Sequence, residues 1–299
     1  MRRVVLGVVV LVLCLFSSVP QASAATRSYR YVTDSLRIGS TAFEASTFAF
    51  DLDGDKRKDN VMGQALVLLP IGLDEAMADA LLEGDIVVLH TLRADSLKDD
   101  VRASWQVHLG IPQPDPVLTG GGTFSIDPSA TPGTRQVGAV SDGRFVGRGG
   151  IIVLRLGVAE GLPPVEVSLH GARVRADCLR RSCQGKLGGG ITAAEFDDEV
   201  VPAIAAQMQT VVETDPDCEP PLPESCDGIP RMLLDLFDAN HDGELTADEL
   251  RANLLFTVVF SPDLDLLLAD GRPGQDGIRE SISVGLGFTA RYATFGGRA

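Results

Sequence analysis

Apolar and polar residues alternate over short stretches in the first half of the chain, and this alternation predicts β-strands. The clearest stretch is residues 101–109, in which every second residue is apolar. Residues 28–50 are also β-like in pattern. Further strands are expected at 86–92, 123–126, 144–146, 151–156 and 165–172. Because half-buried antiparallel strands alternate in this way, residues 25–176 are predicted to form an antiparallel sandwich or barrel.

Apolar residues at helical spacing interrupt these strands and dominate the third quarter of the chain. One helix is predicted after Asn60, and a second is predicted over residues 74–83. Further on, a capping box formed by Thr192 and Glu195 opens a longer helix. Two shorter helices are expected on either side of residues 238–249.

A long strand is predicted near the end of the chain, because residues 282–292 alternate between apolar residues and small or polar ones. We expect it to return to the N-terminal sheet, which makes the helical part an insertion. Residues 178–190, with two cysteines and three consecutive glycines, are expected to form a hinge and turns. The predicted fold class is therefore α+β, an antiparallel β-sandwich or barrel with inserted helices. The expected regions are a signal peptide (1–24), a β-rich region (25–176), a helical region (177–260) and a loop with the closing strand (261–299).

The first residues predict export from the cytoplasm. Two arginines precede an apolar run from Val4 to Phe16, and the small residues Ala22, Ser23 and Ala24 follow. This order is typical of a secretory signal peptide cleaved near Ala24, so the protein is expected to be secreted, periplasmic or on the cell surface. No later segment is apolar enough to span a bilayer.

The chain is strongly acidic. The chain has 41 acidic and 26 basic residues and a formal charge of −15; without the two arginines of the signal peptide the charge is −17. Such a surface argues against binding to nucleic acid or to anionic membranes, and it suits a protein that collects cations.

Four cysteines follow the signal peptide, and in an oxidising compartment their even number predicts two disulfides. Three connectivities are open, of which the local pairs Cys178–Cys183 and Cys218–Cys226 are favoured. The alternative is a zinc site with four thiolate ligands. It is disfavoured because neither spacing is the short one that zinc sites use.

Residues 238–249, the C-terminal acidic loop, carry the strongest chemical signal in the chain. Counted from the first residue, oxygen-bearing side chains stand at positions 1, 3, 5, 9 and 12, with a glycine at 6 and Leu245 at 8. Calcium is a hard cation that takes about six to eight oxygen ligands, and this spacing turns alternate side chains inward. The alternative is a solvated acidic turn. The expected ligands are Asp238, Asn240, Asp242, Thr246, Glu249 and the backbone carbonyl of Glu244.

Residues 51–59, the N-terminal acidic loop, repeat part of this pattern. Aspartates stand at positions 1, 3, 5 and 9, but Gly54 stands at position 4 and Met62 replaces the closing glutamate at 12. Carboxylates at this density repel one another unless a cation lies among them. A solvated acidic turn is again the alternative. The expected ligands are Asp51, Asp53, Asp55, Asp59 and the backbone carbonyl of Arg57.

The remaining candidates do not single out a catalytic site. The histidines lack the spacing of a metalloprotease, and His90 shares an apolar strand face, which favours a core residue. There is no G-x-S-x-G elbow and no complete phosphate loop. An enzyme is therefore not favoured, although a glycosidase pair among the many carboxylates stays open. A third acidic cluster, predicted to lie in a loop, consists of Asp263, Asp265, Asp270 and Asp276.

The C-terminal acidic loop, with Phe237 before it and Leu250 after it, resembles the calcium loop of an EF-hand. The resemblance implies calcium binding by the ligands named above. EF-hands normally occur in pairs bridged at position 8, whereas here the other acidic loop lies far upstream. That loop is closer to the abbreviated loops of dockerin-like and integrin-like repeats. The combination with a signal peptide also resembles uncharacterised secreted bacterial proteins.

The sequence therefore favours an exported, disulfide-bonded protein in which calcium braces loops of a structural or ligand-binding scaffold. One alternative is a calcium-dependent adhesion or carbohydrate-binding module, which the aromatic content of 5% disfavours. The other alternative is a calcium-stabilised secreted hydrolase. Calcium is the one partner that a motif identifies, and no motif names a protein or glycan partner.

Overall fold

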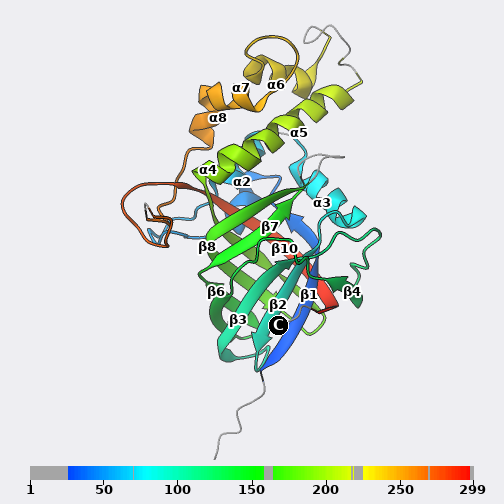
Figure 1. Cartoon of the computed structure of the whole chain (residues 1–299), viewed down its shortest axis with the longest axis vertical. Coiled ribbons are helices and arrows are strands. Elements are labelled where there is room, and N and C mark those ends of the chain that lie inside the picture. The colour runs from blue at the N-terminus through cyan, green and yellow to red at the C-terminus, as the bar shows by residue number, and fades with distance from the viewer. Residues whose placement is uncertain are drawn as a thin grey trace, which may run out of the picture.

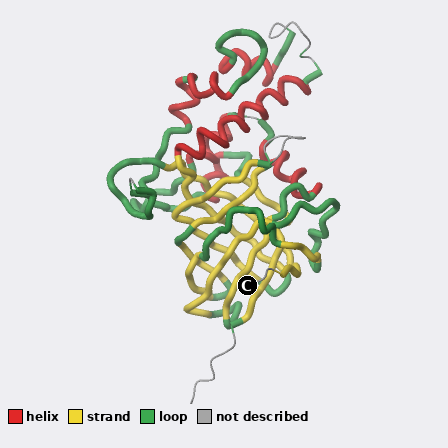
Figure 2. The backbone as a smooth tube through the Cα atoms, in the orientation of Figure 1, coloured by secondary structure: helices red, strands yellow, loops and turns green. Residues whose placement is uncertain are grey.

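The structure, a computed structural model, describes residues 26–69, 71–157, 164–216, 218, 225–268 and 270–296. The predicted signal peptide lies outside these residues. The fold is mixed α+β, with a sheet of 10 strands at one end of the molecule and most of the helices at the other (Figures 1 and 2).

The described residues form strands, α-helices and one π-helical turn. The strands are β1 (Arg27–Arg37), β2 (Val88–Ala94), β3 (Asp100–Leu109), β4 (Gly122–Ser125), β5 (Gln136–Ser141), β6 (Arg144–Arg148), β7 (Ile151–Leu156), β8 (Val165–Cys178), β9 (Ser182–Thr192) and β10 (Ser281–Gly296). The helices are α1 (Ala42–Phe48), α2 (Val61–Leu68), α3 (Leu73–Glu83), α4 (Ala193–Glu195), α5 (Val201–Thr214), α6 (Gly228–Phe237), α7 (Ala247–Ala252) and α8 (Leu254–Val259). The π-helical turn, Phe196–Val200, joins α4 to α5.

Eight of the strands form a closed ring. The hydrogen-bonded path runs through β1, β2, β3, β5, β6, β8, β9 and β10, and β10 then pairs with β1. Every pairing around this ring is antiparallel. The other two strands add to it, because β4 pairs in parallel with the end of β10 and β7 pairs with the first part of β8. The closing strand β10 thus returns to the N-terminal strand.

One hydrophobic core runs from the ring into the helical layer. Within the ring the side chain of Trp105 stacks on Phe145, with ring centroids 5.5 Å apart, and Phe288 lies 5.9 Å from Trp105. The same buried cluster includes Met208 of α5 and Phe237 of α6. The helices are therefore packed onto the ring through shared apolar contacts, which removes their apolar faces from water.

The segment that was expected to be a hinge is instead strand β9, which pairs with β8 on one side and with β10 on the other. The predicted turn at its three consecutive glycines is therefore wrong. Glycines on β9 and β10 allow α1 and the residues after it to lie against the outer face of these strands. A Cβ atom on Gly287 would lie 2.2 Å from Phe48 Cε1, and one on Gly285 would lie 2.7 Å from the Phe48 carbonyl oxygen.

Two further elements differ from the sequence prediction. Part of the β-like stretch 28–50 is helix α1, which begins where Thr41 accepts a hydrogen bond from the Glu44 N–H. Strand β5 was not predicted at all. The expected exit helix after the C-terminal acidic loop is divided at Asn253 into α7 and α8, because Asn253 ends one helix and caps the next.

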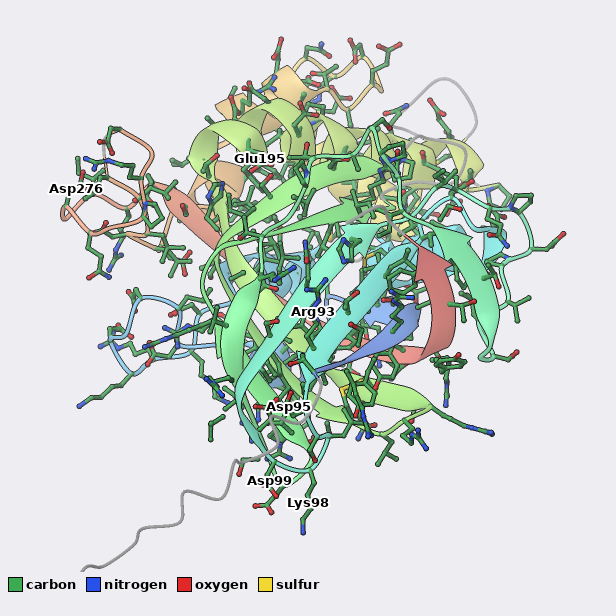
Figure 3. The ribbon with its side chains drawn as sticks, turned by 60° about the horizontal axis from the view of Figure 1, so that its bottom comes forward. Arg93, Asp95, Lys98, Asp99, Glu195 and Asp276 are labelled. Atoms are coloured by element: carbon green, nitrogen blue, oxygen red, sulfur yellow. A yellow bond between two sulfur atoms is a disulfide. The ribbon has the colours of Figure 1, made fainter. Side chains whose placement is uncertain are left out.

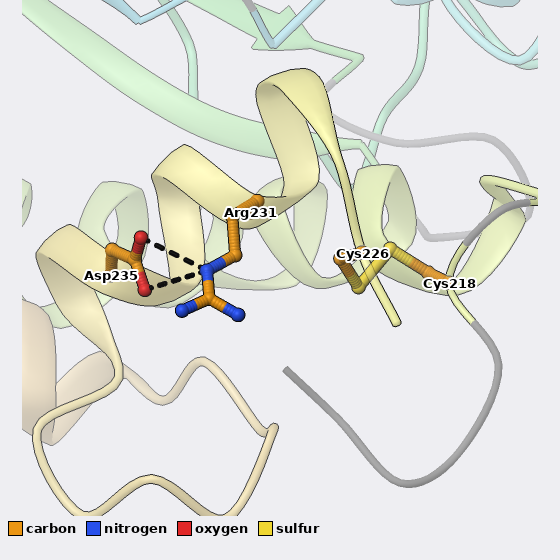
Figure 4. The surroundings of a disulfide bond; sticks show 4 residues. All are labelled: Cys218, Cys226, Arg231 and Asp235. Carbon is orange, nitrogen blue, oxygen red and sulfur yellow. Dashed lines mark hydrogen bonds and ion pairs between the residues drawn. A yellow bond between two sulfur atoms is a disulfide. The ribbon is translucent and has the colours of Figure 1, made fainter. Parts of the chain in front are cut away.

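Both favoured disulfides, Cys178–Cys183 and Cys218–Cys226, are present. The first closes the turn between β8 and β9. The second lies just before α6, where Arg231 and Asp235 form an ion pair one helical turn apart (Figure 4). All four sulfurs are therefore used in disulfides. None of the helices in the described ranges is long and apolar enough to cross a membrane.

Candidate metal centre

The N-terminal acidic loop (residues 51–59) joins α1 to α2 and is folded back on itself. The Asp59 carboxylate accepts a hydrogen bond from the Leu52 N–H at 2.6 Å, which ties the end of the loop to its beginning. As a result, carboxylate oxygens of Asp51, Asp53 and Asp59 lie within 4.8 Å of one another. Among the described residues, this is the one group of three or more acidic, histidine or cysteine side chains that is gathered so closely.

Burial and the neighbouring carboxylates perturb the titration of Asp59. Its pKa is raised to about 6, chiefly because burial penalises the charged carboxylate. The hydrogen bond from Leu52 opposes this shift, and repulsion by Asp53, Asp263 and Asp55 adds to it. A cation among the oxygens would lower the pKa of Asp59, since it favours the charged form of each carboxylate.

The other predicted ligands of this loop do not join the group. The Asp55 carboxylate accepts a hydrogen bond from the Arg57 N–H at 2.7 Å, and it lies 4.0 Å from the Arg57 guanidinium. By contrast, Asp263 is brought close enough to Asp59 to repel it. Asp263 accepts hydrogen bonds from the N–H and the hydroxyl of Ser283, at 2.8 and 2.7 Å, so its place beside the loop is fixed by strand β10.

The segment that carries the third acidic cluster, residues 261–280, contacts the N-terminal acidic loop through Gln275, whose amide donates to the Asp53 carbonyl at 3.1 Å. Asp265 accepts hydrogen bonds from the N–H groups of residues 276 and 277. Figure 3 shows Asp276 on the part of this segment that projects from the sheet. Of the third acidic cluster, Asp263 is the member that the fold brings close to Asp59.

Asn60 anchors the end of the loop to strand β10. Its side chain is 1% exposed and makes four hydrogen bonds. The Oδ1 atom accepts from the N–H groups of Gly63 and Gly285, at 3.1 and 2.8 Å. The Nδ2 group donates to the carbonyls of Ala45 and Gly285, at 2.8 and 3.3 Å. One amide therefore caps α2 and also connects α1 with the middle of β10.

The C-terminal acidic loop (residues 238–249) joins α6 to α7. The Asp238 carboxylate is buried and accepts from the N–H of Gly243 at 2.9 Å and of Asp242 at 3.3 Å. At the other end, the Glu249 carboxylate accepts from Ala239 and Asn240 through one oxygen, and from Thr246 through the other. Glu249 thus connects the two ends of the loop.

The side chains of this loop point at its own backbone and are not gathered like those of the N-terminal acidic loop. Asn240 and Asp242 each accept an N–H from two residues further on, at 2.8 and 2.9 Å. The Glu244 side chain is exposed. Gly243 has a φ of 84°, a conformation that favours glycine and that matches the sharp turn expected at position 6.

Helix α5 packs against the C-terminal acidic loop. Leu245 at position 8 is buried, and its N–H donates to the side-chain oxygen of Gln209 at 2.8 Å. The loop is thus held to α5 by a contact between distant segments, for which the sequence held no signal.

The remaining candidates from the sequence do not form a further site among the described residues. His90 is buried in the ring, where its Nε2 lies 2.7 Å from the Thr33 hydroxyl oxygen, and burial lowers its pKa to about 3. Among the large aromatic side chains, Phe43 of α1 is mostly exposed and Tyr292 of β10 is less than half exposed, and they lie on different elements. These positions do not form the aromatic strip that a carbohydrate-binding face would carry.

Comparisons of the chain with protein-family models, with curated proteins and with solved structures found no match. Function is therefore inferred from the two acidic loops and from the surfaces around them.

Proposed function

We propose that this chain is an exported calcium-binding protein in which calcium braces loops of a structural or ligand-binding scaffold. The observation that carries the proposal is the gathering of the carboxylates of Asp51, Asp53 and Asp59 in a loop that joins two helices. Three carboxylate oxygens suit a hard divalent cation, for which calcium is the abundant extracellular candidate.

At the N-terminal acidic loop, Asp51, Asp53 and Asp59 would supply side-chain oxygens. Asp263 lies near enough to Asp59 to repel it and would add negative charge to the same region. A bound ion would remove this repulsion, and it would also hold the loop against β10, because Asn60 follows the loop directly. The expected effect is structural: the ion joins α1, α2 and β10.

We extend the proposal to the C-terminal acidic loop, which we regard as a single EF-hand-like site. Asp238, Asn240, Asp242, Thr246 and Glu249 would turn their oxygens from backbone N–H groups to the ion, and Glu244 would offer its carbonyl. Support comes from the Gly243 conformation and from Glu249, which already connects both ends of the loop. The ion would then brace α6 and α7 against α5.

The scaffold in this proposal is the closed ring of strands, a barrel that carries inserted helices. Extracellular calcium modules bind at about 10⁻⁴–10⁻³ M, so calcium at such sites is held constitutively and stabilises structure. The two disulfides suit export to an oxidising compartment. Binding to the native state alone raises the free energy of unfolding by mass action.

Thermal unfolding with calcium and with EDTA tests this function. At a free calcium concentration about 100 times the dissociation constant, we expect about 2.7 kcal/mol of added stability for each site. For a chain of this size that corresponds to a melting temperature higher by roughly 5–10 °C. Glu249→Gln should lose the part of the calcium-induced rise in melting temperature that comes from the C-terminal acidic loop. Asp79→Asn, an exposed substitution on α3, should keep the whole rise. Equal melting temperatures in calcium and EDTA would contradict the proposal.

Asp59→Asn is expected to change stability in opposite directions with and without calcium. The folded-state pKa of Asp59 is raised to about 6, so the protonated carboxyl stabilises the folded protein. This stabilisation is complete below the ordinary pKa of 3.8 and is lost as the pH rises through 6. Asparagine removes the charge and keeps an oxygen for the Leu52 N–H. At pH 7.5 the variant should therefore melt above the wild type in EDTA and below it in calcium. A variant that melts above the wild type in both buffers would argue against a metal site here.

A further inference from the structure

A groove of about 590 Å³ lies on the outer face of the ring, on the side where α1 packs. Its lining comes from β1, β6, β8, β9 and β10, from α1 and from the N-terminal acidic loop. Glycines of β9 and β10, Gly185 and Gly287, form part of the lining. The carboxylates of the proposed calcium sites are not part of it. The groove is therefore a separate surface feature of the scaffold.

The charge of this groove is opposite to that of the chain. The chain has a formal charge of −15, yet the groove is lined by five cationic side chains and one carboxylate. The cations are Arg37, Lys58, Arg144, Arg175 and Lys186, and the carboxylate is Asp177. Such a concentration of positive charge on an acidic protein raises the local concentration of anions and repels cations.

Three of these cations are not neutralised by a carboxylate. Arg144 is paired with Asp177, with 2.7 Å between the guanidinium nitrogen and the carboxylate oxygen. Arg37 is likewise paired, with carboxylates of α1 and α3. Within the described parts of the chain, Lys58, Arg175 and Lys186 have no ion pair. Lys58 and Arg175 are exposed, and their side chains have no hydrogen-bond partner among those residues.

Lys186 is held in place at the edge of the groove. Its ammonium group donates to the carbonyls of Thr47 and Ala49, at 2.9 and 2.6 Å, which leaves one of its three N–H donors for a ligand. It also lies 4.5 Å from the centre of the Phe50 ring. Its pKa is lowered to about 8, chiefly by burial and then by repulsion from Lys58 and Arg175. The three cations are therefore close enough to interact, and an anion among them would relieve their repulsion.

We propose that this groove binds a dianionic phosphoryl group, either as inorganic phosphate or as the phosphate of a small hydroxylated ester. Three unneutralised cations suit a group with nearly two negative charges better than a single carboxylate. The hydroxyls of Ser35 and Thr289 and the amide of Gln184 also line the groove, and they supply neutral hydrogen-bonding groups for the rest of an ester. Of the two aromatic residues in its lining, Phe288 is buried and Phe48 is only partly exposed, so neither offers the open ring face on which single-stranded nucleic acid stacks.

The two sources of the phosphoryl group can be separated by calorimetric titration at pH 7 and constant ionic strength, in calcium-free buffer. Inorganic phosphate and glycerol phosphate are the probes, and acetate is the monoanionic control. We expect both phosphates to bind and acetate not to bind. A tighter complex with glycerol phosphate indicates that the groove also recognises the ester, whereas equal affinities indicate recognition of the phosphoryl group alone.

Substitutions at the exposed cations test where the phosphate binds. Lys58→Gln and Arg175→Gln each remove one charged donor and should weaken binding by about tenfold. The matched control is Arg102→Gln, an exposed strand position on β3 that does not line the groove. Circular dichroism verifies that each variant is folded. The proposal is overturned if neither phosphate binds to the folded protein, if acetate binds as well as phosphate, or if the groove variants bind like the control.

Discussion

Asn60→Ala is expected to lower the free energy of unfolding by about 3–5 kcal/mol, because it removes all four hydrogen bonds of a buried amide. A buried backbone group that loses its partner costs about 1–3 kcal/mol. The substitution removes the hydrogen-bond partner of four backbone groups: the N–H of Gly63, the N–H and the carbonyl of Gly285, and the carbonyl of Ala45. Part of the cost is recovered where water enters the space left by the side chain.

Chemical denaturation followed by circular dichroism measures this change. Gln64→Ala is the matched control, because it removes an exposed amide from the same helix and should change stability by less than about 0.5 kcal/mol. Asn60→Asp keeps the acceptor for Gly63 and Gly285 but replaces the donor, so it should also be destabilising. A loss below about 1 kcal/mol in Asn60→Ala would show that this side chain does not hold α2 to β10.

Acidification is expected to destabilise the protein through His90. Burial lowers the folded-state pKa of His90 from 6.5 to about 3, so below pH 6.5 the unfolded chain binds a proton that the folded chain does not. The stability from His90 is therefore complete above pH 6.5 and decreases as the pH falls toward 3. One such proton lowers the free energy of unfolding by up to about 1.4 kcal/mol per pH unit.

The difference between the wild type and His90→Gln isolates this contribution, because both chains share every other titrating group. Glutamine retains a partner for the Thr33 hydroxyl and cannot be protonated, so the variant should lose stability less steeply between pH 6 and 4. Gln64→Ala, an exposed substitution that changes no titrating group, should retain the wild-type slope. NMR provides a second measurement, in which the His90 ring signals should not titrate above pH 4. Parallel slopes in wild type and His90→Gln would contradict the assignment.

Elements with a strong local pattern were predicted well. The alternation over 101–109 matches β3, and the apolar spacing after Asn60 matches α2. Strand β9 was mistaken for a hinge because glycine has no side chain with which to show alternation. Those glycines make room for segments that are distant in the sequence, because a Cβ atom on Gly188 would lie 3.1 Å from Phe50 and one on Gly190 would lie 2.7 Å from Leu266. A pattern within one segment cannot reveal such a contact.

In the candidate sites, too, residues close together in the sequence were predicted, and contacts between distant segments were not. The spacing of Asp51, Asp53 and Asp59 is local, and their carboxylates are gathered as that spacing predicts. Asp263 was placed in a separate cluster because only the pairing of β10 brings it to the loop. The three unneutralised cations of the groove come from the loop before α2 and from strands β8 and β9. They therefore had no common motif, and calcium binding at either acidic loop stays a prediction.

The pairing of β1 with β10 sets a condition on the order of folding. These two strands are the first and the last of the ring along the chain, and Tyr31 pairs with Tyr292. A nascent chain that lacks β10 therefore has open backbone edges on β1 and β9, which invite pairing with other chains. Closure joins segments of high sequence separation, so its rate is expected to be slow. Until the last strand has been delivered, both edges are expected to be exposed to aggregation.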